Sequence, residues 1–184
     1  MFVRDRMSAP AVSVSPKATA SLALALMDKR KIRRLPVIQD GKLVGIVTRS
    51  DLMAARHALS KEAVTTVAHV MTRKPVSVQR EDPLEVAADL MRVKKVSGLP
   101  VLDGDRLVGI LTESDLFRAL CQMLGIGEKG ARIMMSVGDT EDLLEAVQGR
   151  LKNLTVRSLV TMHDPKRSVW DVVMRVRGRS SRSF

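Results

Sequence analysis

The heptapeptide GIVTRSD occupies Gly45–Asp51, and GILTESD occupies Gly109–Asp115. Each places a glycine, a threonine and an aspartate at the same spacing within or just after an apolar run. The apolar run indicates a strand, and the Thr-x-x-Asp ending is typical of the first turn of a helix. The chain therefore builds one strand-to-helix corner twice, with the two occurrences 64 residues apart.

The repetition extends well beyond the corners. Three further segments match at the same offset: LPV (35–37 and 99–101), LVGI (43–46 and 107–110) and VSV (12–14 and 76–78). Each repeat reads as an extended segment, a helix, a strand, a tight glycine turn, a return strand and a second helix, or β-α-β-β-α. Because a unit of about 60 residues is marginally stable alone, we expect the two repeats to pack sheet to sheet and share one core.

Composition limits the class of protein. Hydrophobic residues make up 45% of the chain, which argues against disorder. Aromatic residues make up only 2%, so the stacking platforms of single-strand nucleic-acid binders are scarce. The net charge of +11 favours anionic partners, although high charge also serves solubility alone. The sequence leaves these two interpretations open.

Targeting and catalytic signals are weak. We find no apolar run long enough for a membrane span and no signal peptide in the opening MFVRDRMSAP, and the single Cys121 suits a reducing compartment. We therefore expect a cytoplasmic protein without a membrane partner, with Cys121 buried. His57, His69 and His163 lack ligand spacing, and no nucleophilic constellation is evident. We predict neither a catalytic nor a metal site.

The corner itself suits a ribose phosphate. A helix N-terminus offers free backbone N–H groups to an anion, threonine adds a hydroxyl, and aspartate accepts hydrogen bonds from a ribose. Gly45 and Gly109 would let a ring approach the strand closely. The alternative is a capping box, in which Thr and Asp only satisfy backbone groups. Both functions are compatible in an unliganded protein.

The ordered landmarks M-(S/T)-x-P-x-(S)-V, LPV, DG and LVG-h-h-T-x-x-D, in two copies, resemble the CBS motif, named for cystathionine β-synthase. The resemblance covers roughly residues 1–124 and implies a Bateman module, which binds an adenosine-containing ligand and regulates another activity. The implied ligands are AMP, ADP, ATP or S-adenosylmethionine, with no covalent cofactor. The implied nucleotide-binding residues are Thr48, Asp51, Thr112, Asp115, Arg33, Arg34, Ser97 and Gly98.

The two implied sites differ in charge. The positions before LPV are Arg33-Arg34 in the first repeat and Ser97-Gly98 in the second. Arginine gives charge-assisted contacts to phosphate, whereas Ser-Gly gives almost none. If the repeats pack head to tail, as the resemblance implies, the arginines reach the corner of Thr112 and Asp115. That corner would then hold the more phosphorylated ligand.

The last fifty residues form a separate unit. We expect a Gly-rich linker at 125–130, a β-α-β-β domain at 131–178 and a basic tail at 179–184. The domain resembles a truncated ACT domain, a ferredoxin-like regulatory fold, so the whole chain is similar to the acetoin-utilisation CBS-CBS-ACT type. Its last strand alternates Trp170, Val172, Met174 and Val176, a row that we expect to lie uncovered and to favour association.

The sequence thus predicts an α/β fold with CBS motifs at 1–64 and 65–124, followed by the partial ACT-like domain. We expect a non-enzymatic regulatory homodimer that binds an adenine nucleotide and acts on an unknown protein, with 131–178 contributing to the dimer interface. The alternative is a nucleic-acid-binding regulator that uses the basic surface and the RVRGRSSR tail.

Overall fold

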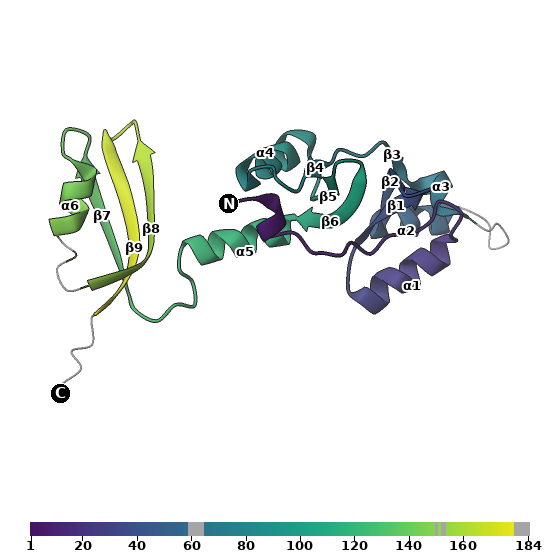
Figure 1. Ribbon diagram of the computed structural model, residues 1–184, viewed down its shortest axis with the longest axis horizontal. Coiled ribbons are helices and arrows are strands. Elements are labelled where there is room, and N and C mark those ends of the chain that lie inside the picture. The colour runs from purple at the N-terminus through teal and green to yellow at the C-terminus, as the bar shows by residue number, and fades with distance from the viewer. Residues whose placement is uncertain (59–64, 150, 152–153, 179–184) are drawn as a thin grey trace. The chain divides into compact units, whose positions relative to one another are not determined.

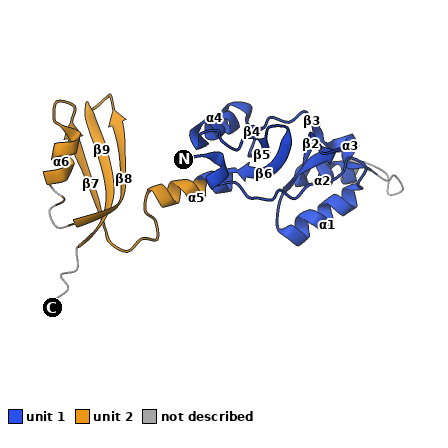
Figure 2. Ribbon diagram, viewed as in Figure 1, with its two compact units in different colours: residues 1–116 blue, residues 117–184 orange. Residues whose placement is uncertain are grey.

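The computed structural model describes residues 1–58, 65–149, 151 and 154–178. The chain divides into two compact units, Met1–Leu116 and Phe117–Phe184 (Figures 1 and 2). The predicted tail at 179–184, the end of the predicted first motif and the side chain of His57 lie outside the described residues.

The two repeats have the same elements in the same order (Figure 1). The first contains α1 (Ala20–Arg30), β1 (Arg34–Gln39), β2 (Lys42–Thr48) and α2 (Arg49–Ala58). The second contains α4 (Leu84–Lys94), β5 (Gly98–Asp103), β6 (Arg106–Thr112) and α5 (Glu113–Met123). The segments that lead into the repeats contain η1 (Val3–Asp5) in the first, and α3 (Val67–Val70), β3 (Thr72–Arg73) and β4 (Val78–Gln79) in the second.

Local sequence explains where these elements begin and end. The Thr19 hydroxyl accepts a hydrogen bond from the Leu22 N–H and caps the start of α1. Lys31 and Lys95 adopt the left-handed conformation that closes α1 and α4. Gly41 and Gly104 have positive φ in the turns between the paired strands, as the sequence predicted.

The strands of the first unit form a six-stranded sheet. Its order is β1-β2-β6-β5-β4, with β3 also paired to β2. The hairpins β1–β2 and β5–β6 have equivalent registers, but they meet at one pair only, Lys42 with Arg106. The extended segment expected at the start of each repeat forms less strand than predicted. In the second repeat it is β4, which spans two residues, and in the first repeat it is the single bridge from Val14 to Val37.

Each repeat begins by pairing with the other repeat. Thr72, at the start of the second repeat, pairs with Ile46 of β2. Ser8, at the start of the first, pairs with Ile110 of β6. We call the segments 1–10 and 65–74 the leader segments. Because the exchange is mutual, each hairpin is completed by the leader segment of the opposite repeat.

An exchanged segment also contributes to the hydrophobic core of the opposite repeat. The core cluster of the first repeat is built from its own residues and closed by Val67, which belongs to the second leader segment and is fully buried. Equivalent positions in the two repeats are buried together: Ala23 and Ala87, Leu35 and Leu99, Val37 and Val101, Val47 and Leu111. The repeats are thus joined by exchanged segments, where the sequence predicted two sheets packed over one shared core.

The second unit contains β7 (Ala131–Gly138), α6 (Leu143–Gly149), β8 (Leu154–Asp164) and β9 (Val169–Gly178). The strands form an antiparallel sheet in the order β7-β9-β8, which agrees with the predicted β-α-β-β arrangement. The linker remains close to this sheet, because Arg175 donates hydrogen bonds to the carbonyls of Glu128 and Gly130.

One expectation for this unit is wrong. Val172, Met174 and Val176 do not lie uncovered, because they form its core together with Val137 and with Val147 of α6. Trp170 and other partly buried residues pack around this cluster. A helix of seven residues is sufficient to cover the inner face of β7 and β9. The row of apolar residues on β9 therefore stabilises the unit internally.

Candidate functional site

The two Thr-x-x-Asp corners have nearly identical geometry. At the end of β2, Asp51 Oδ2 lies 2.9 Å from Thr48 N and 2.7 Å from Thr48 Oγ1. At the end of β6, Asp115 Oδ2 lies 2.9 Å from Thr112 N and 2.6 Å from Thr112 Oγ1. The repeated sequence thus gives a repeated arrangement of side chains.

In both corners the aspartate caps the start of a helix. It accepts the threonine N–H and hydroxyl, and in the first corner Asp51 N also donates to Thr48 Oγ1 at 3.3 Å. This is the capping alternative that the sequence left open. A carboxylate offers about four acceptor positions, so capping through Oδ2 is compatible with further donors. Asp115 is only 4% exposed, whereas Asp51 is partly exposed.

Each corner lies beside the residues that precede its own LPV strand. Arg49 N donates to the Arg33 carbonyl at 2.8 Å, and Glu113 N donates to the Ser97 carbonyl at 3.3 Å. Within each hairpin Arg34 is paired with Thr48, and Gly98 with Thr112. The residues before LPV and the corner therefore lie at the same end of the strands.

Arg34 connects the two repeats at this end. Its Nη2 donates to Ser97 Oγ of the second repeat at 2.7 Å. Gly98 is buried beneath it, and a Cβ built on Gly98 would lie 2.4 Å from Arg34 Nη1. A glycine at this position is thus required for the arginine to occupy its place. Arg33, in contrast, is exposed.

The surroundings of Arg34 affect its ionisation. Partial burial lowers the pKa of the Arg34 guanidinium from its usual value. The Glu113 carboxylate acts in the opposite direction, and Arg33 adds to the lowering. Arginine nevertheless stays protonated in proteins, so a half-buried cation lies beside the second corner. Glu113 was not among the predicted site residues, although its charge is opposite to that of Arg49 at the equivalent position.

The space beside Gly45 and Gly109, where a ligand ring was expected to approach, is occupied in this structure by methionine side chains. A Cβ on Gly45 would lie 2.6 Å from Met71 Sδ, and a Cβ on Gly109 would lie 2.6 Å from Met7 Sδ. The close approach is thus made by a methionine of the opposite leader segment. The match of Met7 with Met71 between the repeats was visible in the sequence, but no role was assigned to either.

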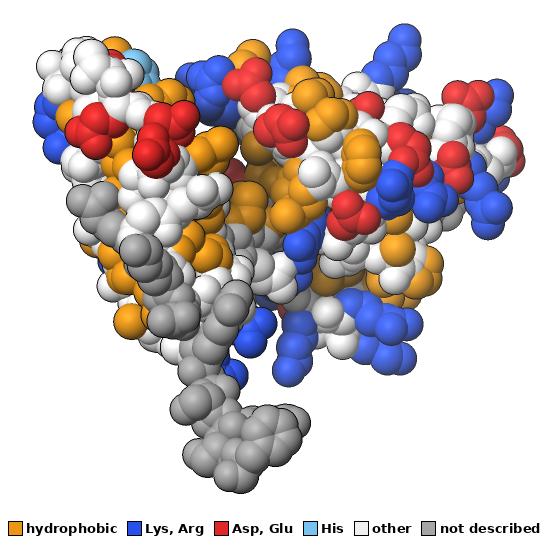
Figure 3. Space-filling view, turned by 60° about the vertical axis from the view of Figure 1, so that its left-hand side comes forward, with side chains coloured by type: hydrophobic (Ala, Val, Ile, Leu, Met, Phe, Trp, Pro, Cys, Tyr) orange, Lys and Arg blue, Asp and Glu red, His pale blue; other side chains and the backbone are white. Residues whose placement is uncertain are grey.

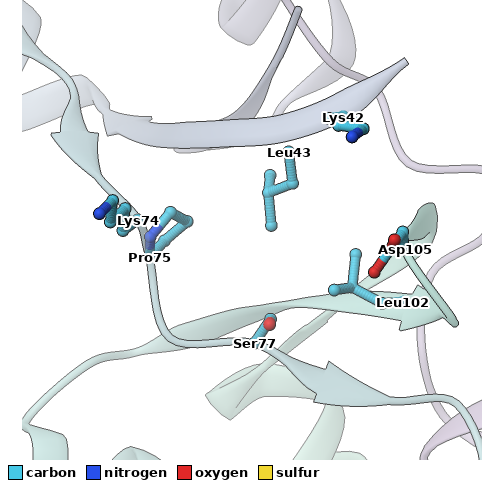
Figure 4. Close-up of a pocket in the computed structure, with 7 residues that line it drawn as sticks. All are labelled: Lys42, Leu43, Lys74, Pro75, Ser77, Leu102 and Asp105. Atoms are coloured by element: carbon cyan, nitrogen blue, oxygen red, sulfur yellow. The ribbon is translucent and has the colours of Figure 1, made fainter.

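A cavity of about 330 Å³ opens at the other end of the strands (Figure 4). It is lined by Lys42, Leu43, Lys74, Pro75, Ser77, Leu102 and Asp105. None of the eight predicted site residues lines it. Lys42 begins β2 and Thr48 ends it, so a whole strand separates this cavity from the first corner.

The structure describes side-chain contacts for two of the three singled-out histidines. Among the described residues no cluster of His, Cys, Asp and Glu could hold a metal ion. His69 contacts Thr66, and His163 contacts Asp139. Cys121 was expected to be buried, but it is exposed, because it lies two residues beyond the buried Ala119 and hence on the opposite side of α5. No described helix is long and apolar enough to span a membrane.

The exchanged repeats and their paired corners define a class of protein. The CBS domain model matches residues 3–58 and 67–122, and the chain therefore belongs to the CBS domain family, with two CBS motifs in tandem. A CBS domain-containing protein of Dictyostelium discoideum is 36% identical over 136 residues, which cover 67% of this chain and 94% of that protein. The C-terminal sheet lies beyond the matched residues.

Solved structures resemble the chain over the same region. The CBSX2 protein of Arabidopsis thaliana in complex with AMP is 35% identical, with a TM-score of 0.59 over 66% of this chain and 96% of that one. The CBS domain pair of protein MJ0100, in complex with 5-methylthioadenosine and S-adenosyl-L-methionine, is 30% identical, with a TM-score of 0.60 over 65% and 95%. A putative acetoin utilization protein, AcuB, from Vibrio cholerae is 32% identical, with a TM-score of 0.62 over 71% and 98%.

Proposed function

We propose that this chain is a non-enzymatic regulatory protein that binds an adenosine-containing nucleotide between its two CBS motifs. The observation that carries the proposal is the arrangement at the end of the strands, where Arg34 of one repeat lies against Ser97 and Gly98 of the other. Each corner supplies a carboxylate for ribose hydroxyls, and Arg34 supplies a cation for phosphate.

The relatives support an adenosine ligand. CBSX2 has been solved with AMP, and the MJ0100 pair with 5-methylthioadenosine and S-adenosyl-L-methionine. These molecules share adenine and ribose but differ in charge. We infer that the shared part binds at the Thr-x-x-Asp corners and that residues before LPV select the charged group. For this chain the candidates remain AMP, ADP, ATP and S-adenosylmethionine.

The two corners are proposed to be unequal. Arg34 donates to Ser97, whose carbonyl accepts from Glu113 N, so a cation and a hydroxyl lie near the corner of Thr112 and Asp115 and can bind phosphate oxygens. The residue equivalent to Arg34 on the other side is Gly98, which offers no side chain. Arg49, at the first corner, already forms an ion pair with Asp28. The corner of Thr112 and Asp115 is therefore the one that prefers more phosphate.

A thermal-shift panel tests the proposal directly. A ligand at one hundred times its Kd stabilises the folded state by about 2.7 kcal/mol. For a chain of this size that corresponds to a rise in Tm of roughly 5–10 °C. We expect such a rise with at least one of the four candidates. If none of them, at millimolar concentration, raises the Tm, the proposed function is wrong.

We further propose that the protein is a homodimer. Helix α5 carries an exposed apolar stripe of Phe117, Leu120 and Met123, at 67%, 45% and 46% exposure. Their spacing of three residues places them along one side of the helix. An exposed apolar stripe favours association, and a two-fold contact would cover both stripes at once. Light scattering that finds only monomers at micromolar concentration would exclude this.

A nucleic-acid-binding regulator is the second candidate. The observation in its favour is a group of exposed cations at the C-terminal ends of α1 and α4: Lys29, Arg30, Lys31, Arg92, Lys94 and Lys95. The bond from Arg34 to Ser97 brings these two ends together. Cations there also complement the helix dipoles. Binding of duplex DNA that weakens by orders of magnitude between 50 and 200 mM salt would support this candidate.

A further inference from the structure

The outer edge of β7 is an unprotected sheet edge. Strand β7 pairs with β9 over all eight of its residues without a register shift. Within the described part of the chain no strand pairs with its other side. Its sequence, ARIMMSVG, contains one charged residue, and Met134 is 64% exposed. A regular, apolar and unpaired edge is the kind that recruits another strand.

The other edge of the same sheet is protected. Strand β8 has a bulge between Val156 and Ser158. The bulge leaves Arg157 without a cross-strand partner on β9, and its side chain is exposed. Bulges and edge cations are the devices by which natural sheets prevent edge-to-edge pairing. The contrast between the two edges indicates that β7 has been left able to pair.

The sheet also carries opposite charges at its two ends. One end, where β7 begins and β9 ends, holds Lys129, Arg132, Arg157, Arg175 and Arg177, and among the described residues there Glu128 is the one acid. The other end holds Asp139, Glu141, Asp142, Asp164 and Asp171 against Lys166 and Arg167. Figure 3 shows acidic side chains gathered near the histidine at one end of this unit, in the upper left of the view.

Like charges also lie side by side within the sheet. Arg132 of β7 is directly paired with Arg175 of β9 and therefore shares a face with it. Four residues along the same face, Ser136 donates to Asp171 Oδ1 at 2.6 Å. Adjacent like charges on a sheet are destabilising. An acid brought next to Arg132 from outside the sheet would relieve this repulsion.

We propose that β7 pairs in an antiparallel manner with β7 of a second molecule, about a two-fold axis near Met134, to give a six-stranded sheet. Met134 then lies opposite its own copy, and Arg132 lies opposite Ser136 of the second molecule, beside Asp171 there. The positive end of each sheet meets the negative end of the other. Both α6 helices lie on the same face, and no apolar edge remains exposed.

This contact is self-complementary and needs no further partner, since a two-fold axis satisfies both edges with a single interface. It depends neither on nucleotide binding nor on the apolar stripe of α5. A failure of the contact therefore leaves the proposed function unaffected, and a failure of the nucleotide panel leaves the contact unaffected.

Disulfide trapping in the full chain tests the contact. Met134→Cys is made in a Cys121→Ser background, with Thr161→Cys on β8 as the matched control, since both positions are exposed. Directly opposed residues in an antiparallel pair have Cα atoms about 4.5–5.5 Å apart, within disulfide range. We expect Met134→Cys to form covalent dimers at least about tenfold faster than Thr161→Cys. Equal rates, or a faster control, overturn the proposal.

Charge reversal gives a second measurement. In the proposed register Lys129 faces Asp139 of the second molecule. Lys129→Glu and Asp139→Lys, each made in the full chain with Met134→Cys, are expected to slow trapping by about fivefold. The double reversal restores attraction and is expected to recover most of the rate. If the double variant is trapped as slowly as the slower single variant, the proposed register is wrong. If none of the three variants changes the rate of trapping, the charge argument is wrong.

Discussion

Replacing Asp115 with alanine, next to the matched replacement of Asp51, separates the capping role of the corners from their proposed ligand role. Each aspartate accepts the N–H and the hydroxyl of its threonine at nearly the same distances. Loss of such a helix cap costs about 1–2 kcal/mol. Because the geometry is shared, both variants should lose a similar amount of unfolding free energy without ligand.

Ligand binding should distinguish the two variants. A hydrogen bond to a charged group contributes about 1.5–3 kcal/mol, or roughly a 10- to 150-fold change in affinity. Since Arg34 lies beside the corner of Asp115, we expect Asp115→Ala to weaken ADP or ATP binding by that factor. Asp51→Ala should weaken it by less.

Isothermal calorimetry on the full chain measures both affinities, and denaturation without ligand measures the capping loss. Lys74→Ala, in the cavity at the other end of the strands, is the control for binding elsewhere. Equal effects at the two corners, or a larger effect for Asp51→Ala, refute the reasoning about Arg34. A loss confined to Lys74→Ala would place the nucleotide in the cavity and refute the corner assignment altogether.

Three further outcomes are expected. Gly98→Ala should displace the Arg34 side chain, whose Nη1 lies 2.4 Å from the new Cβ position, and should weaken triphosphate binding more than S-adenosylmethionine binding in the same calorimetric assay. Gly109→Ala should force Met7 away from the strand and lower unfolding free energy by about 1–3 kcal/mol in urea denaturation; an unchanged midpoint would contradict the close packing. Met174→Ala should cost the C-terminal unit about 2–5 kcal/mol and broaden its amide NMR signals, while a value below 1 kcal/mol would exclude it from the core.

Much of the first unit could be predicted because its sequence is written twice. The repeated LPV and LVGI segments indicated the paired hairpins, and glycine marked both turns. The corners were predicted with both of their alternatives, and the structure has the hydrogen bonds of the capped form. The family was identifiable because every landmark of the motif stands in order.

The exchange of leader segments was not predictable for a physical reason. Met7 and Met71 are the same residue, and each would fit equally well against Gly45 or Gly109. Because the two hairpins have nearly the same sequence, the pattern of residues cannot determine which hairpin a given leader segment pairs with. Only the path of the connecting chain decides this, and that path is a property of the whole fold.

The sequence also did not predict which apolar faces are covered by other elements in the fold. The alternation along β9 is the same whether α6 covers that face or solvent does. Cys121 lies in an apolar stretch of α5, but its exposure depends on which side of the helix faces the core. In both cases the periodicity predicted which residues share a face of the element. Whether that face is buried depends on tertiary packing.

The exchanged leaders have a consequence for how such a protein can be divided. A cut between the repeats would remove from each half the strand that completes it, so neither half is an independent building block. Met7 would leave with the wrong hairpin, and Gly109 would face water. A single repeat would have to exchange leader segments with a second molecule to complete its hairpin, and that pairing would depend on protein concentration. In the tandem chain the same pairing is intramolecular, so it is independent of protein concentration.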